Sequence, residues 1–202
     1  MAINLANNNS LANITALPSS ISGGAMTLLA TQTASGSANL SFTSGIDDTY
    51  DSYVFKFYNI HPATDNVQFL FNMSSDSGSN YNVTKTTTYF LAEHNATGGS
   101  ANLSYQSAKD LAQSTDFQKL MTDLGNAADE NLSGYLTIYN PSSTTFAKNF
   151  MSRTNAQAYS ATNISFDNYI AGYGNTTSAV NAVQFKMSSG TFDGVIKLYG
   201  VS

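Results

Sequence analysis

Cysteine and tryptophan are both absent from the 202-residue chain. Without cysteine the chain can form no disulfide, no thiolate nucleophile and no cysteine-based metal site, although this absence does not identify a cellular compartment. The lack of tryptophan disfavours a lectin that stacks sugars on indole rings, without excluding it. Histidine occurs only twice, so a histidine-based metal site would have at most two imidazole ligands.

Charged residues are scarce as well. They make up 10% of the chain, with a net charge of −5, whereas a typical globular domain has about 25%. Lys and Arg form no cluster, which argues against a protein that binds the phosphate backbone of nucleic acids. The surface must therefore be polar but largely neutral. Such a surface suits a protein that packs against copies of itself or against another polymer.

Long apolar runs are also missing. No stretch approaches the about 18 apolar residues that a transmembrane helix needs. The N-terminal MAINLANNNS has neither a basic start nor a continuous apolar segment, so it does not resemble a secretory signal peptide. We expect the protein to be made in a cytoplasm and to leave the cell, if at all, by another route, such as inside an assembled particle.

What the chain does contain is a high proportion of apolar and aromatic residues, 42% and 12% respectively, arranged with a period of two after residue 25. Segments such as YDSYVFKFYNI and VQFLFNMSS alternate in this way and read as strands. Strands of about five to nine residues separated by turn signals predict a β-sandwich or a β-barrel. We expect residues 26–202 to form a single antiparallel β-sandwich domain, jelly-roll-like in topology.

Residues 1–25 differ from the rest of the chain. They are rich in Asn, Ser and Ala and end at the break Gly23-Gly24. A frayed tail is the plain alternative. We favour an arm that docks on a neighbouring subunit through its spaced apolar residues, Leu5, Leu11, Ile14, Leu17 and Ile21.

One segment departs from the period of two. In STDFQKLMTDLGN, the residues Phe117, Leu120, Met121 and Leu124 have helical spacing. A Ser or Thr precedes them as a candidate N-cap, and Gly125 follows as a stop signal. This pattern predicts a short helix near 115–125, with an irregular strand connection as the alternative.

The stretch FKFYNIHPATDNVQF brings His61 close to Asp65, with Pro62 between two apolar runs. A catalytic interpretation would make His61 a base oriented by Asp65, but no nucleophile is evident. Because Pro cannot donate a ladder hydrogen bond and Asp-Asn favours turns, the chain should turn here. We interpret the stretch as a corner between two strands.

Acidic residues offer two further candidates. Asp47, Asp48 and Asp51 could ligate a hard cation, but without a calcium-loop spacing a solvated turn is the simpler interpretation. A carboxylate pair for glycoside hydrolysis could be drawn from Asp47, Asp51, Asp65, Asp129 and Glu130. Nothing in their spacing selects a pair, so we predict no catalytic, cofactor or metal site.

Exposed tyrosines are candidates for surface recognition. Tyr159, Tyr169 and Tyr173 lie in YSATNISFDNYIAGYGN, which reads as a loop-and-edge region. Their rings could stack on sugars or form a subunit contact. The plain alternative is an ordinary place in the core or at its rim.

Three phrases resemble a family of tailed-bacteriophage virion proteins that is common in marine and cyanobacterial phages. They are LLATQTASGSANLSFTSGIDDTYDSYVFKFYNIHPATDNVQF, YLTIYNPSSTTFAKNF and YIAGYGNTTSAVNAVQFKMSSGTFDGVIKLYGVS. The pattern SSG-x-x-D-G-x-I-K-LYG at the end is the most specific. The resemblance covers most of residues 26–202 and implies a virion component. It implies no catalytic residues and no cofactor.

The resemblance and the composition together predict a non-enzymatic structural protein on the surface of a virion, as a capsid decoration protein or a stand-alone tail fibre or knob. Its expected partners are other virion proteins, such as major capsid or tail proteins, and copies of itself, with a trimer as the commonest symmetric solution. A second hypothesis is a receptor-binding tail adhesin for host-surface glycan or protein, with function in the loops around 159–175. A third is a tail-associated glycan hydrolase.

Overall fold

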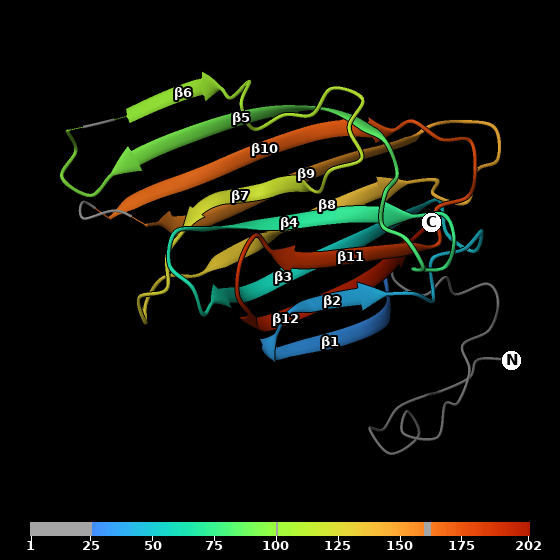
Figure 1. Ribbon diagram of the computed structural model, residues 1–202, viewed down its shortest axis with the longest axis horizontal. Coiled ribbons are helices and arrows are strands. Elements are labelled where there is room, and N and C mark those ends of the chain that lie inside the picture. Colours follow the sequence, from blue (N-terminus) through green and yellow to red (C-terminus); the bar gives the residue numbers. More distant parts are fainter. Residues whose placement is uncertain (1–25, 100, 160–162) are drawn as a thin grey trace, which may run out of the picture.

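The computed structural model describes residues 26–99, 101–159 and 163–202 (Figure 1). These residues form twelve strands and no helix, and every strand pair is antiparallel. The strands are β1 (Thr27–Ser37), β2 (Asn39–Phe42), β3 (Ser52–Pro62), β4 (Val67–Ser74), β5 (Lys85–Asn95), β6 (Ala101–Tyr105), β7 (Gln118–Leu124), β8 (Leu132–Tyr139), β9 (Lys148–Ala158), β10 (Ile164–Gly174), β11 (Ala182–Met187) and β12 (Phe192–Val201).

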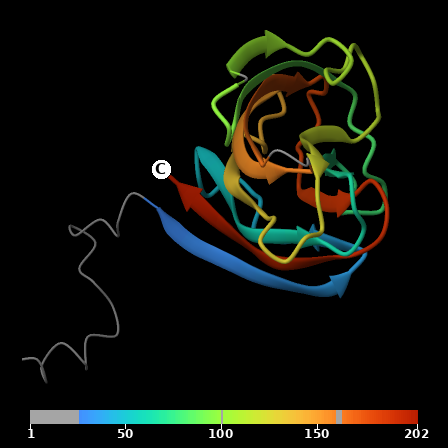
Figure 2. The ribbon, with the colours of Figure 1, turned by 90° about the vertical axis from the view of Figure 1, so that its left-hand side faces the viewer.

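The strands form two layers that are parts of one hydrogen-bonded sheet. The larger layer has the order β1-β12-β3-β8-β9-β10-β5-β6, and the smaller has the order β7-β4-β11-β2. The layers join where Leu124 of β7 pairs with Ala158 of β9. On the opposite side β1 leads directly into β2, and Gln32 Nε2 donates a hydrogen bond to the Ser41 carbonyl (2.9 Å). The sheet therefore curls until it nearly closes, as the end-on view of Figure 2 shows.

This arrangement confirms the prediction of a mainly β, antiparallel fold. It differs from the predicted sandwich because the hydrogen-bonded ladder continues from one layer to the other at the β7–β9 junction. The predicted arm at 1–25, with Leu5, Leu11, Ile14, Leu17 and Ile21, lies outside the described residues.

Phenylalanine rings fill the space between the layers. The ring of Phe185 on β11 lies at their centre and is fully buried. Its centroid is 5.2–6.5 Å from the centroids of Phe42, Phe55, Phe57, Phe69 and Phe71. Most of these contacts are edge-on, the geometry that the charge distribution of aromatic rings favours. The alternating Phe positions of β3 and β4 thus point to one core.

The predicted helix near 115–125 is wrong, because residues 118–124 form strand β7. Leu124 pairs with Val67 and Met121 with Phe69, so three steps along β7 match two along β4. This extra residue is a β-bulge, and Asp123 adopts a positive φ of 57° within it. The bulge turns Leu120, Met121 and Leu124 toward the core with a spacing that imitates a helix. Pairing with β4 outweighs local preference, since a helix this short is only marginally stable.

Two lysines are buried at the same end of the sheet. Lys85 on β5 and Lys148 on β9 both pair with Gly174 on β10. Lys85 Nζ donates to Asn72 Oδ1 (2.6 Å) and to the Val83 carbonyl (2.7 Å), while Lys148 Nζ donates to two backbone carbonyls. Burial lowers the pKa of Lys85 to about 7 and also lowers the pKa of Lys148.

Candidate functional site

Two of the three predicted recognition tyrosines lie in the middle of a sheet, not in a loop. Tyr169 and Tyr173 belong to β10, which runs between β9 and β5 in the larger layer. They are four positions apart on one strand, so both side chains point to the same face, the outer one. Tyr159 follows the end of β9 and is half exposed, but it is six positions beyond Arg153, the β9 partner of Tyr169. The structure therefore brings Tyr169 and Tyr173 together and leaves Tyr159 apart.

The outer face of the larger layer carries a row of aromatic and basic side chains. Each member lies directly opposite the next across neighbouring strands, where cross-strand side chains touch. From β6 to β12 the row is Tyr105, Phe90, Tyr169, Arg153, Tyr135, Lys56 and Lys197.

At the centre of this row three side chains hold one another in place. Arg153 forms an ion pair with Asp167 (Nη2–Oδ2 2.7 Å), and its Nε also donates to Asp167 Oδ1 (3.0 Å). The Tyr169 hydroxyl donates to Asp167 Oδ2 (3.0 Å). The guanidinium carbon of Arg153 lies 4.8 Å from the centre of the Tyr169 ring, within cation–π distance. The bidentate contact between Arg153 and Asp167 fixes the plane of the guanidinium group.

The electrostatics of this trio follow from its hydrogen bonds. The hydrogen bond from Arg153 keeps the pKa of Asp167 below its usual value. The hydrogen bond that Tyr169 donates to Asp167 raises the pKa of the Tyr169 hydroxyl, because ionisation would remove the donated proton. At neutral pH the trio therefore holds one positive charge, one negative charge and one neutral hydroxyl, and is neutral in sum.

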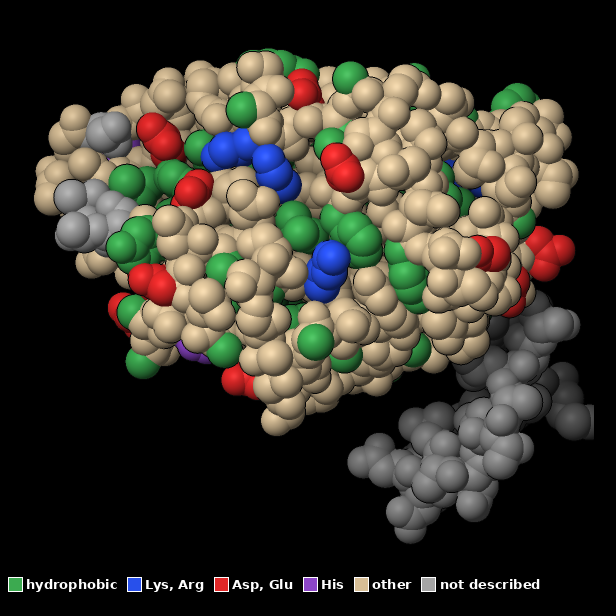
Figure 3. All heavy atoms as spheres, in the orientation of Figure 1, with side chains coloured by type: hydrophobic (Ala, Val, Ile, Leu, Met, Phe, Trp, Pro, Cys, Tyr) green, Lys and Arg blue, Asp and Glu red, His purple; other side chains and the backbone are tan. Residues whose placement is uncertain are grey.

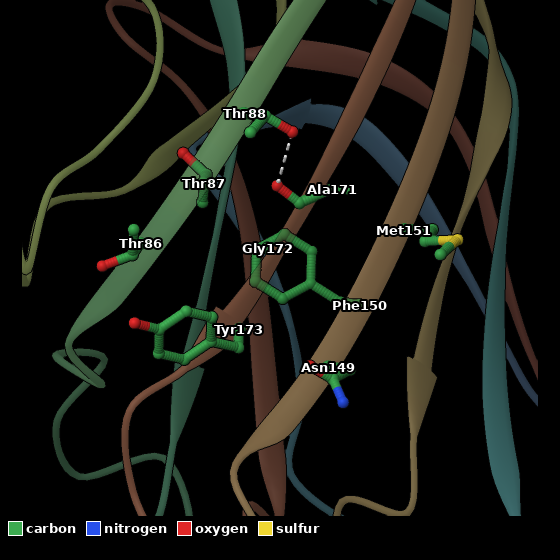
Figure 4. Close-up of a pocket in the computed structure, with 9 residues that line it drawn as sticks. All are labelled: Thr86, Thr87, Thr88, Asn149, Phe150, Met151, Ala171, Gly172 and Tyr173. Carbon is green, nitrogen blue, oxygen red and sulfur yellow. Dashed lines mark hydrogen bonds between the residues drawn. The ribbon is translucent and has the colours of Figure 1, made fainter.

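Three adjoining hollows follow β9 and β10 along this face. The first, about 300 Å³, is lined by Arg153, Asn155 and Asp167 with Ser133, Gly134 and Tyr135. The second, about 340 Å³, is lined by Tyr135, Arg153 and Tyr169 with Phe90 and Met151. The third, about 350 Å³, is the one in Figure 4, lined by Tyr173, Asn149 and Met151 with Thr86 and Thr88.

Neighbouring hollows share lining residues and therefore adjoin, and we call the three together the β9–β10 groove. Asn155 is six positions from Asn149 along β9, so the groove is about 20 Å long. Ala171 lies between the two tyrosines of β10 and is too small to fill the floor. Figure 4 shows Tyr173 beside Thr86, and the hydrogen bond from Thr88 Oγ1 to the Ala171 carbonyl (3.4 Å).

Glycine at position 134 shapes one end of this groove. A Cβ atom there would lie 2.3 Å from the Arg153 carbonyl oxygen and 2.8 Å from Thr154 Cα, both of them backbone atoms of β9. Any other residue would therefore push β8 away from β9. The absence of a side chain lets the two strands approach each other at the edge of the hollow beside Asp167.

His61 and Asp65 do not form a pair. His61 Nδ1 donates to the Glu130 carbonyl (2.6 Å), and Asp65 Oδ1 accepts from the Asn126 backbone (3.2 Å). β3 ends at Pro62 in the larger layer and β4 begins at Val67 in the smaller. The interpretation of this stretch as a corner is confirmed.

The acidic turn before β3 is held by Asp47. Asp47 Oδ1 accepts from the Thr49 backbone and from the Tyr53 hydroxyl, both at 2.9 Å. The Thr49 backbone hydrogen bond keeps the pKa of Asp47 low. Within residues 26–99, 101–159 and 163–202, no group of three His, Asp or Glu side chains is placed to hold a metal ion.

Charge elsewhere is dispersed. On the face that Figure 3 displays, over β4, β7 and β11, basic and acidic side chains occur singly or in small groups among uncharged surface. The described part of the chain also has no helix of the length and apolar character needed to cross a bilayer.

Sequence reasoning missed Phe90, Tyr135, Met151, Arg153 and Asp167. The period of two in NFMSRTN and ISFDNY already places Met151 and Arg153 on one face of β9 and Asp167 and Tyr169 on one face of β10. The faces of these residues could therefore be predicted from the sequence. The neighbours of each strand and their register could not.

Comparison with models of known protein families, with curated proteins and with solved structures returns no match. The site is accordingly interpreted from its own geometry.

Proposed function

We propose that the chain is a non-enzymatic structural protein of a bacteriophage particle, displayed on its surface as a capsid decoration protein or as a stand-alone fibre or knob. The observation that carries the proposal is the outer face of the larger layer. There a rigid sheet holds exposed aromatic rings in a row, with Tyr135, Tyr169 and Phe90 each about two-fifths exposed. Aromatic residues are enriched where proteins contact partners.

The location on a particle is supported by the resemblance of residues 26–202 to virion proteins and by the low charge of the surface. A charge of −5 over 202 residues offers little repulsion between crowded copies. We also propose that the two layers are a variant of a jelly-roll sandwich, supported by their shared phenylalanine core. A homo-oligomer, with a trimer as the first expectation, belongs to the same proposal.

Labelling of intact particles tests this proposal. Gold-conjugated antibody against the purified protein is added to phage particles and imaged by electron microscopy. We expect label on the head for a decoration protein and on the tail for a fibre or knob. Absence of label, with the protein detected by neither mass spectrometry nor blotting of the particles, would refute the proposal.

The predicted arm at 1–25 gives a second test of assembly. Burying one apolar side chain of the size of Leu or Ile contributes about 1.5–3 kcal/mol. Deletion of residues 2–22 should therefore abolish incorporation into particles, while circular dichroism of the purified protein keeps its β spectrum. Normal incorporation of the truncated protein would show that the arm is not the docking element.

A second candidate function is a receptor-binding tail adhesin for host-surface glycan or protein. The β9–β10 groove favours it, because a concave, preformed surface with aromatic walls and a few fixed polar groups is typical of binding sites. Saturable binding of the purified protein to host cells, competed by the same protein without label, would support the adhesin over a purely structural role.

A further inference from the structure

We propose that the β9–β10 groove binds a neutral oligosaccharide in an extended conformation, with Tyr169 as the stacking platform and the Arg153–Asp167 pair as the polar anchor. The biological setting of this inference rests on the adhesin candidate above. The binding itself is a property of the purified protein and can be tested alone.

The shape of the groove fits an extended chain. It is about 20 Å long and follows the strands, and its three hollows of about 300, 340 and 350 Å³ adjoin one another. A compact ligand would fill one hollow and leave the others empty. A linear chain of several sugar rings would place successive rings in successive hollows.

The walls present apolar side chains to the solvent, with Tyr135 and Tyr169 at one level of this path, both opposite Arg153. Tyr135, Tyr169 and Met151 are 43%, 40% and 56% exposed, so their apolar surfaces are available to a ligand. Tyr173 lies four residues beyond Tyr169 on the same face. The flat C–H face of a sugar ring packs against an aromatic ring, and the tyrosine hydroxyls at the ring edges can bond to sugar hydroxyls.

The polar anchor is ready for hydrogen bonding before any ligand arrives. Arg153 is held by Asp167 on one side and by the Tyr169 ring on the other. A guanidinium has five N–H groups, and the ion pair occupies its Nε and one of the Nη2 protons. The three remaining N–H groups are free to bind a ligand. Because the Arg153 side chain is already ordered, binding through them loses little conformational entropy.

The charge of the groove selects a neutral ligand over a charged one. Within the described ranges, Arg153 and Asp167 are the only charged residues among those that line the three hollows, and they neutralise each other. A charged polymer would therefore meet no net charge of opposite sign in the groove. The other polar lining groups are Ser, Thr and Tyr hydroxyls and Asn amides, which match sugar hydroxyls.

The same chemistry argues against a second copy of this chain as the occupant. Interfaces between copies bury a large continuous apolar area. The groove is instead interrupted by polar groups at Asn149, Asn155 and Thr88, and its apolar side chains stand apart. A self-association through this face is nevertheless measurable, and it is one outcome of the test.

Titration of the ¹⁵N-labelled protein with neutral tetrasaccharides tests the inference. The probes are unbranched tetrasaccharides of glucose, galactose, mannose, xylose and N-acetylglucosamine, together with a sulfated form of each. We expect at least one neutral member to shift the amide signals of residues 149–155 and 167–173 in a saturable way. Its sulfated form should bind more weakly.

Matched variants locate the site. Tyr169→Ala should lower the affinity about tenfold or more, because the stacking platform is lost. Tyr58→Ala is the control, since Tyr58 is also 40% exposed on the outer face but lies on β3, outside the groove. It should leave the affinity unchanged. Tyr169→Phe keeps the ring and should lose only a few-fold, and unfolding curves verify that each variant is folded.

Several results would overturn the inference. They are the absence of saturable shifts with every neutral tetrasaccharide at millimolar concentration, equal losses in Tyr169→Ala and Tyr58→Ala, and tighter binding of a sulfated form. Sedimentation that shows a dimer dissociated by Met151→Asp would assign the face to a second copy and also overturn it.

The outcome for the groove is separable from the outcome for the particle. Saturable sugar binding without label on phage particles would keep the oligosaccharide site and refute the virion proposal. Label on particles without sugar binding would do the reverse.

Discussion

The two faces of the larger layer are both aromatic, but they use different aromatic residues. The inner face carries phenylalanines such as Phe55, Phe57 and Phe150, which are at most 1% exposed. The outer face carries mainly tyrosines, with Tyr135 and Tyr169 about two-fifths exposed. One hydroxyl group separates the two residue types. Its hydrogen-bonding requirement decides which face each can occupy.

The exceptions support this explanation. Tyr53 and Tyr89 are fully buried, yet the Tyr53 hydroxyl donates to Asp47 Oδ1 (2.9 Å) and the Tyr89 hydroxyl to Asn168 Oδ1 (2.7 Å). Each of these two buried tyrosines thus has a partner for its hydroxyl. The inner face therefore packs in the core, and the outer face carries hydroxyls that can form hydrogen bonds with a ligand.

The largest effect should come from removing the central core ring of the smaller layer, against which the inner face of the larger layer packs. Phe185→Ala removes a fully buried ring that contacts five others, so we expect a loss of about 3–5 kcal/mol in the free energy of unfolding. Urea unfolding followed by circular dichroism measures it. Phe90→Ala, on the outer face at 44% exposure, is the control. Equal losses in the two variants would contradict the contrast between the faces.

The next effect is the pH dependence of stability that the buried amine of Lys85 should cause. Lys85 has a pKa of about 7 when folded and about 10.4 when unfolded. Between these values the unfolded chain binds more protons, so stability should rise with pH, by at most about 1.4 kcal/mol per pH unit. This gain is absent below pH 7 and complete above the unfolded pKa.

Lys85→Met should flatten this dependence, which urea unfolding at pH 7 to 9.5 would reveal. Lys148 contributes in the same direction, because burial lowers its pKa too, so part of the slope should persist. A wild-type stability that falls with pH over this range would show that the hydrogen bonds from Lys85 to Asn72 and Val83 keep the amine charged.

A smaller effect is expected where the two strands of the groove meet β8. Gly134→Ala places a Cβ against the backbone of Arg153 and Thr154, so we expect a loss of about 1–3 kcal/mol from overpacking. Thermal unfolding measures this loss. Gly36→Ala is the comparison, because a Cβ there meets no atom within 4 Å while the φ of +59° is strained for any residue other than glycine. A loss of stability at Gly36 as large as that at Gly134 would indicate that backbone strain, and not contact with β9, destabilises the Gly134 variant.

The smallest effect should come from the outer hydroxyl itself. Tyr169→Phe removes one exposed hydrogen bond to Asp167, and the stability should change by less than about 0.5 kcal/mol. Phe185→Tyr, the reverse exchange in the core that the inner face covers, should cost about 1–3 kcal/mol because the new hydroxyl is buried. If neither exchange changes the free energy of unfolding in chemical denaturation, the hydroxyl does not determine which face carries Tyr and which carries Phe.

Much of the fold could be predicted from the sequence, and the reasons are local. Alternation in YDSYVFKFYNI and VQFLFNMSS marks inner and outer positions one by one, and Pro62 with Asp65 marks the corner between them. The helix was mispredicted because a bulge at Asp123 changes the period of β7. A bulge is imposed by the partner strand β4, and no pattern within residues 115–125 reveals it.

The candidate site was only partly accessible to such reasoning. Tyr169 and Tyr173 were selected for their residue type, but their place in a central strand was not foreseen. Arg153 and Asp167 are 14 residues apart in sequence and meet because β9 and β10 pair in a particular register. That register depends on the whole sheet.

The pairing of β1 with β12 has a consequence for synthesis. Thr27–Ser37 pairs only with Phe192–Val201 in the ladder of the larger layer, so the first described strand must wait for the last. At about 5–20 residues per second a ribosome needs roughly 10–30 s to make the intervening chain. During that time β1 offers an unpaired edge to any nascent neighbour. Once a neighbouring copy has completed its own β12, that strand can accept β1 of the first copy, giving a domain-swapped pair through a strand that in one molecule only closes the sheet.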